Sequence, residues 1–173
     1  MRHRFAMLGL LSGIIATAAA GGIVTFAQSK PAQRSPLQGV WRIVETTVTG
    51  PNARVVDMTK AGLGGLIIVT ERHWSFNTET GDKPRPPLPG ANATADDLRA
   101  TWGPFDAQAG TYELNGNETT LHDIVAKSPA LLQPGAFIVV SFRREGDTAW
   151  ITQVRSQAGP FPNPVTWKLS RLE

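Results

Sequence analysis

The sequence contains no cysteine, and this absence excludes several kinds of chemistry. A chain without cysteine forms no disulfide bond, binds no iron-sulfur cluster or zinc ion through thiolates, and has no cysteine nucleophile. It also lacks the cysteine through which a bacterial lipoprotein is anchored. Any function must therefore depend on other side chains.

Charged residues are few, at 18% of the chain, and their signs nearly cancel. The formal net charge is +3, but Arg2 and Arg4 belong to a basic N-terminal start. Without these two, 15 of the 17 lysines and arginines remain against 14 acidic residues. A nearly neutral surface does not attract a polyanion, so we expect no nucleic-acid partner.

Few residues could carry catalysis or bind a metal ion. Beyond the N-terminal start the only histidines are His73 and His122, and no acidic residues are spaced as ligands beside them. Ser141 lacks the glycines of a nucleophile elbow, and the glycine-rich segment 62–65 is not followed by the lysine of a phosphate-binding loop. We therefore expect no metal site, no cofactor and no assigned catalytic residue.

The N-terminus has the pattern of an export signal. Residues 1–4 are basic, and residues 5–27 contain no charge. This arrangement is typical of a signal peptide. Small residues allow cleavage after Ala20 or after Ala27, and the second site is favoured because a polar stretch begins at Gln28.

We therefore predict a signal peptide over residues 1–27, a linker over 28–36, and a folded domain over 37–173 in the periplasm or outside the cell. The alternative is an uncleaved anchor, because the apolar run approaches the roughly 20 residues that span a bilayer. Gly21 and Gly22 interrupt that run. Contact with a membrane is expected only through this segment.

The sequence of the domain predicts short strands joined by turns. Glycine and proline are abundant, with 17 and 13 residues, and punctuate the chain. Hairpin turns are indicated at 115–117 (Asn-Gly-Asn) and 145–147 (Glu-Gly-Asp). β-branched and aromatic residues predict about eight strands, at 39–48, 66–70, 73–78, 110–114, 119–126, 136–143, 148–154 and 165–171.

One short helix is predicted over residues 95–102. Thr94 is suited to cap it, and Asp96 and Asp97 lie in the first turn, where the positive end of a helix dipole favours acids. The proline-rich segment before it, 81–92, is expected to be a loop because proline cannot donate to a strand ladder. The whole pattern fits an all-β sandwich or an up-and-down barrel. We favour a single antiparallel barrel, because closure removes exposed strand edges.

Several short motifs resemble a known family. Gly39-Val40-Trp41 has the Gly-x-Trp pattern that opens lipocalins. The domain resembles the bacterial lipocalin-like domain family over nearly all of 37–173, through motifs at 109–114, 120–122, 134–135, 142–143 and 167–171. The resemblance implies structural roles for Gly39, Trp41 and Arg171, with the Arg171 guanidinium packed over the Trp41 indole. The sequence departs from the family pattern at residues 69–73 and in the proline-rich loop.

The resemblance and the aromatic content together imply a barrel that holds a small apolar molecule. Trp74 and Phe76 share one face of their strand, which we expect to point inward. The lumen residues predicted to bind the ligand are Trp74, Phe76, Tyr112, His122, Phe137, Arg143 and Trp150. Two other functions stay open: an isomerase or cyclase that uses His122 as general acid or base, and a structural or partner-binding barrel with a filled core.

Overall fold

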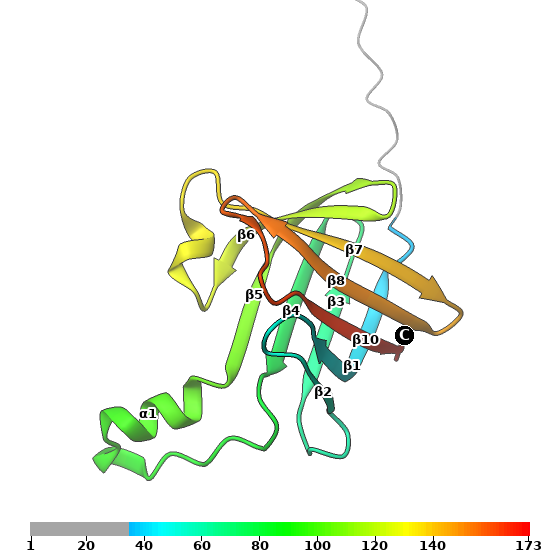
Figure 1. Cartoon of the computed structure of the whole chain (residues 1–173). Coiled ribbons are helices and arrows are strands. Elements are labelled where there is room, and N and C mark those ends of the chain that lie inside the picture. The colour runs from blue at the N-terminus through cyan, green and yellow to red at the C-terminus, as the bar shows by residue number, and fades with distance from the viewer. Residues whose placement is uncertain (1–34) are drawn as a thin grey trace, which may run out of the picture. The chain divides into compact units, whose positions relative to one another are not determined.

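Eight antiparallel strands close into a barrel in the computed structural model of the chain, which describes residues 35–173 (Figure 1). The predicted signal peptide and nearly all of the predicted linker lie outside the described residues. With two short strands outside the barrel, β2 and β9, the described residues form β1 (Gly39–Val48), β2 (Arg54–Asp57), β3 (Gly65–Val69), β4 (His73–Glu79), β5 (Phe105–Asn115), β6 (Glu118–Ala126), β7 (Ile138–Glu145), β8 (Thr148–Ser156), β9 (Gly159–Pro160) and β10 (Val165–Arg171).

The barrel follows the order β1, β3, β4, β5, β6, β7, β8, β10, and β10 then pairs with β1. The predicted all-β fold, an antiparallel barrel of eight strands, is confirmed. Two short strands were not predicted: β2 pairs with the second half of β1, and β9 pairs with the end of β8. Both are too short, at four and two residues, to give a recognisable alternation.

The predicted helix is also confirmed, as α1 (Ala95–Trp102). Thr94 and Asp97 form a capping box, in which the Thr94 hydroxyl accepts from the Asp97 amide at 3.2 Å and the Asp97 carboxylate accepts from the Thr94 amide at 2.9 Å. Residues 81–104, which we name the arm, contain α1 and the short 3-10 helix η1 (Gly90–Asn92). The arm projects from the barrel (Figure 1).

Two side chains attach the arm to the barrel. Arg85 forms an ion pair of 2.8 Å with Glu79 at the end of β4, and its guanidinium lies 4.8 Å from the ring centroid of Phe105. Lys127, which follows β6, donates to the carbonyl oxygens of Trp102, Gly103 and Phe105. Its ammonium therefore neutralises the negative C-terminal end of α1.

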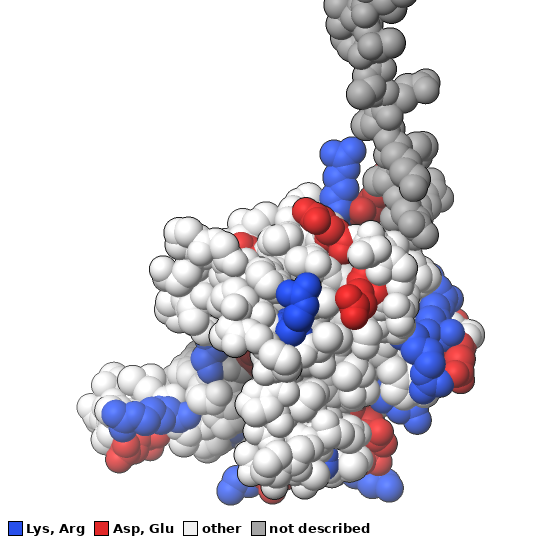
Figure 2. Space-filling view, turned by 45° about the horizontal axis from the view of Figure 1, so that its top comes forward, with Lys and Arg blue, Asp and Glu red and all other residues white. Residues whose placement is uncertain are grey.

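The core lies inside the barrel and contains the side chains that alternate inward along the strands. Trp41, Ala149 and Leu169 are fully buried, and Ile43 is 1% exposed. On the face shown in Figure 2, charged residues of both signs are scattered among uncharged ones. No helix within residues 35–173 has the length and apolar character needed to cross a bilayer.

The two ends of the barrel differ in their connections. The hairpin turns β3–β4, β5–β6 and β7–β8 lie at the end where β1 begins and β10 finishes, because the strands are antiparallel. We name this the closed end. The opposite end, the loop end, carries the arm, the 3-10 helix η2 (Pro129–Leu132) and the β9 connection.

Candidate ligand-binding cavity

Trp41 plugs the barrel at the closed end. Its indole N–H donates to the carbonyl oxygen of Leu37 at 2.7 Å. The Arg171 guanidinium lies 5.6 Å from the indole centroid, at the position that the lipocalin resemblance implies. Arg144 adds a second guanidinium at 5.4 Å, which the sequence did not predict. A fully buried aromatic ring and two cations therefore close this end.

Gly39 has a structural reason to be glycine. Its φ of +133° lies in a region that other residues avoid. A Cβ atom built on Gly39 would lie 2.4 Å from the carbonyl oxygen of Glu173. The close approach of the two chain segments at the barrel seam requires a residue without a side chain.

An apolar cavity of about 60 Å³ lies inside the barrel next to this plug. Seven of the eight barrel strands and the segment before β1 supply its wall. The lining residues are Ser35, Leu37, Ile67, Val69, Trp74, Phe76, Gln108, Tyr112, Thr119, Leu121, Ile138, Val140, Ile151, Gln153 and Trp167. This volume is small compared with sites for drug-sized ligands, which hold about 300–1,000 Å³.

A second pocket of about 160 Å³ lies toward the loop end. It shares Gln153 and Trp167 with the inner cavity, and it is lined also by Met58, Thr78 and Asp106. Trp167 packs edge to face on Phe76, with ring centroids 5.0 Å apart. Trp167 and Gln153 therefore form the boundary that the two spaces share.

Three of the predicted lumen residues, Trp74, Phe76 and Tyr112, do line the cavity. The Trp74 indole N–H donates to the Thr111 carbonyl at 3.1 Å, and the Tyr112 hydroxyl donates to the Thr70 carbonyl at 2.9 Å. Burial raises the pKa of the Tyr112 hydroxyl. Because their polar atoms are satisfied by backbone, these rings present apolar surface to the cavity.

Trp150 and Arg143 were expected in the lumen, and the structure places them on the outer face. Trp150 lies between Ala149 and Ile151, which face the core. Its cross-strand neighbours are Arg143 and Lys168. The Arg143 guanidinium lies 3.7 Å from the indole centroid. The indole is thus covered by a cation on the solvent side, and both lumen predictions are wrong.

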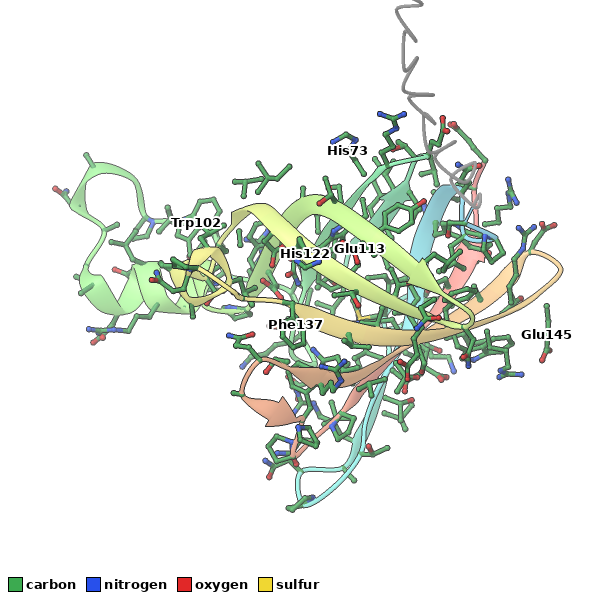
Figure 3. The ribbon with its side chains drawn as sticks, turned by 90° about the horizontal axis from the view of Figure 1, so that it is seen from above. His73, Trp102, Glu113, His122, Phe137 and Glu145 are labelled. Atoms are coloured by element: carbon green, nitrogen blue, oxygen red, sulfur yellow. The ribbon has the colours of Figure 1, made fainter. Side chains whose placement is uncertain are left out.

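His122 and Phe137 do not line the cavity either. The His122 side chain is 43% exposed, and its Nε2 lies 3.9 Å from a carboxylate oxygen of Glu113 on the neighbouring strand (Figure 3). The inward position before it belongs to Leu121. The Phe137 ring lies 5.1 Å from the Arg155 guanidinium. The imidazole lies on the outer face and does not line the cavity, so the alternative of a barrel enzyme loses the general acid or base that it required.

Sequence reasoning missed an inward-facing polar cluster toward the loop end, formed by Asp106, Gln108 and Asp123. Gln108 lines the inner cavity and Asp106 the second pocket. Gln108 Oε1 and Asp123 Oδ1 are buried and accept no hydrogen bond from the described residues. Strand parity could have found them, because Asp106 and Gln108 alternate with Tyr112, and Asp123 alternates with Leu121.

Burial raises the pKa of the Asp123 carboxyl to about 6, and the nearby Asp106 carboxylate adds to the rise. The charge of His122 acts in the opposite direction but is the smallest of the three causes. Among residues 35–173, no ion pair includes Asp106 or Asp123. The carboxylate at position 123 is therefore destabilised in the folded protein at neutral pH.

We expect Asp123→Asn to stabilise the protein at high pH only. A folded pKa of about 6 against a usual value of 3.8 means that ionisation opposes folding. The penalty is absent below about pH 4, grows up to about pH 6 and is constant above it. A fully buried shift would be worth about 3 kcal/mol. Partial exposure reduces this to roughly 1–2 kcal/mol at pH 8.

Urea unfolding at pH 4, 6 and 8 measures this difference in the free energy of unfolding. The control is Glu118→Gln, which removes an exposed carboxylate at the start of the same strand, β6. Its difference from the wild type should not change with pH. An Asp123→Asn effect of equal size at pH 4 and pH 8 would contradict the assignment.

Among the described residues, no group of three or more histidine, aspartate or glutamate side chains is arranged to hold a metal ion. The candidate site therefore consists of an apolar cavity, a polar cluster at its side and a plugged end. Comparison of the chain with family models, with curated proteins and with solved structures finds no match.

Proposed function

We propose that the protein is a lipocalin-like binding protein that holds a small, largely apolar molecule in its barrel. The closed eight-stranded barrel is compatible with that fold, and so is the Trp41 plug with Arg171 over its indole. Export to the periplasm or beyond is part of the proposal. It rests on the basic start and the uncharged run of residues 5–27.

The apolar cavity is the observation that carries the proposal. Its aromatic wall residues Trp74 and Tyr112 have satisfied their polar atoms elsewhere, so the wall that they form favours hydrocarbon. The volume of about 60 Å³ limits the ligand to a few heavy atoms. An aromatic ring needs a cavity of roughly 150 Å³. Such a ligand would also require the second pocket, with Trp167 rotated away from Phe76.

A partner-binding barrel with a filled core is the second candidate function. The small cavity volume favours it, and so do several exposed apolar side chains toward the loop end. Leu98 and Trp102 on α1 are 45% and 49% exposed, and Ile124 and Val125 at the end of β6 are 67% and 60% exposed. Exposed apolar surface of this kind is typical of interaction sites.

Binding of xenon and 1-butanol distinguishes the two functions. We expect both probes to shift the methyl resonances of Leu121, Val140 and Ile151, measured by NMR, because these methyl groups line the cavity. Val69→Phe should abolish the shifts by filling the space beside Trp74. Val55→Phe is the matched control, because Val55 is 65% exposed on β2.

The Val55→Phe variant should respond to both probes as the wild type does. Wild-type methyl resonances that stay unchanged under xenon pressure and at saturating 1-butanol would reject the binding function. That result would favour the partner-binding barrel. If Val69→Phe does not fold, Val69→Leu, which adds one methylene, should still weaken xenon binding.

A further inference from the structure

The polar cluster beside the cavity narrows the class of ligand, and this step rests on the proposed binding function. We infer that the molecule held in the barrel carries an ammonium group, which binds between Gln108 and Asp123 while its apolar part occupies the cavity. Gln108 and Asp123 lie on the same side of the sheet, and each has a buried acceptor atom without a donor. An apolar cavity lies beside them.

Strand geometry places Gln108 and Asp123 on the same side of the sheet. Thr119 and Leu121 on β6 line the cavity, and Asp123 is the next residue of that inward series. Gln108 lines the cavity from β5. In the β5–β6 register Asp123 lies opposite Gly110, two residues from Gln108. Diagonal neighbours lie roughly 7–8 Å apart, a separation that a ligand group placed between the two side chains would bridge.

Both side chains present acceptors that have no donor. Gln108 Oε1 and Asp123 Oδ1 are buried and without a hydrogen-bond partner among the described residues. A buried acceptor left unpaired is costly, and a buried unpaired charge is more so. A ligand that donates hydrogen bonds to both atoms would remove this cost. A ligand carboxylate or phosphate would add repulsion, so the cluster selects against anions.

No lysine or arginine among the described residues forms an ion pair with the cluster, and the charge of His122 is the weakest of the three influences on the pKa of Asp123. Asp106 lies on the same face of β5, two residues before Gln108, and its charge opposes that of Asp123. Lys127 is close in sequence, but its ammonium donates to three carbonyl oxygens of the arm and the start of β5. None of the ion pairs in the described part of the chain reaches Asp106 or Asp123. A positively charged ligand group would supply the missing partner.

The apolar wall favours an organic ammonium over a metal ion. From Gln108 the cavity continues along Phe76 and Trp167 to Trp74, which offer no ligands to a metal. A hydrated metal ion would lose its water against this surface, whereas an alkyl chain gains by contact with it.

A matched set of four-carbon probes tests the charge of the ligand: n-butylammonium, 1-butanol and butyrate. A ligand of about five heavy atoms binds in the micromolar range at best, so each probe is titrated to millimolar concentration. Binding is followed through the methyl resonances of Leu121 and Val140. We expect n-butylammonium to bind at least about tenfold tighter than 1-butanol at pH 8. Butyrate should not bind.

Variants assign the preference to the cluster. Asp123→Asn should bring the affinity for n-butylammonium down to that for 1-butanol, and Asp106→Asn should reduce it in part. Glu118→Gln should leave the preference unchanged. Retention of the tenfold preference in Asp123→Asn would overturn the assignment to this carboxylate.

The pH dependence of the preference for n-butylammonium over 1-butanol is a second test of the role of Asp123. A primary ammonium keeps its charge from pH 5 to pH 8. Protonation of Asp123 therefore removes the preference toward pH 5, because a neutral carboxyl no longer pairs with a cation. Asp106 and His122 also act on this carboxyl, so the profile is repeated in Asp106→Asn and in His122→Gln. The loss of preference toward pH 5 should persist in both.

The outcomes separate this inference from the function on which it rests. If 1-butanol binds as tightly as n-butylammonium, the ammonium class is wrong and the binding function stands. If none of the three probes binds and xenon does not either, the binding function itself fails. A profile in which n-butylammonium binds equally at pH 5 and pH 8 would also overturn the inference.

Discussion

Trp41→Ala is expected to lower the free energy of unfolding by about 3–5 kcal/mol, the range for removal of a buried aromatic side chain. The indole is fully buried and fills the closed end of the barrel. Its loss leaves a cavity beside Leu37, whose carbonyl oxygen loses its donor. It also leaves the guanidiniums of Arg144 and Arg171 without their aromatic partner. Urea unfolding measures the change.

The matched control is Trp102→Ala, because Trp102 is 49% exposed on the arm. Its ring contacts Phe105 and Arg85, so a loss of about 1 kcal/mol is expected from these contacts. The loss for Trp41→Phe should lie between those of the two alanine variants. Phenylalanine keeps a smaller aromatic ring but cannot donate the hydrogen bond to Leu37. If Trp41→Ala were no more destabilising than Trp102→Ala, the plug would not hold the barrel closed.

Gly110→Ala is expected to destabilise the protein by about 3 kcal/mol or more, at or beyond the upper end for overpacking. A Cβ atom at position 110 would lie 1.9 Å from the carbonyl oxygen of His122 and 2.9 Å from the Cα of Asp123. Both atoms belong to backbone, so no side-chain rotation relieves the contact. The strands β5 and β6 would have to separate at the register shift between Ala109 and Gly110.

Gly64→Ala is the control for the glycine substitution. The nearest atom to a Cβ at this position is a carboxylate oxygen of Glu79 at 3.6 Å, an ordinary contact. The expected change in the free energy of unfolding is within about 0.5 kcal/mol. Urea unfolding of Gly110→Ala and Gly64→Ala at one pH measures the free energy of unfolding of each. Equal stabilities would show that β5 and β6 tolerate a side chain at position 110.

Alternation and turn chemistry predicted most of the barrel. The eight strands of the closed sheet follow runs of β-branched and aromatic residues, and the hairpins at Gly116 and Gly146 have the positive φ that their turns require. The capping residue Thr94 located α1. These features are local, so the sequence alone specifies them. The partner of each strand is not local, and only the general cost of exposed strand edges favours closure.

The sequence predicts the candidate site only in part, because residue type and strand parity disagree at several positions. Trp150 is aromatic, yet the smaller Ala149 beside it takes the inward position. Gln108 and Asp123 are polar, yet Gln108 lines the cavity and a carboxylate oxygen of Asp123 is buried. The polar residues Asp106 and Gln108 also hid the true start of β5, at Phe105 instead of residue 110. A bulged register, as at Ala109 and Gly110, cannot be derived from alternation.

The seam between β1 and β10 sets the order in which the chain can fold. Trp41 lies opposite Arg171, so the seam joins the first and last strands of the domain. Bringing together segments about 130 residues apart costs roughly 4 kcal/mol of chain entropy plus a constant. The chain through Arg171 must have left the ribosome before this pairing can form. For a secreted chain, as proposed above, the barrel would close only after β10 had followed β1 across the membrane.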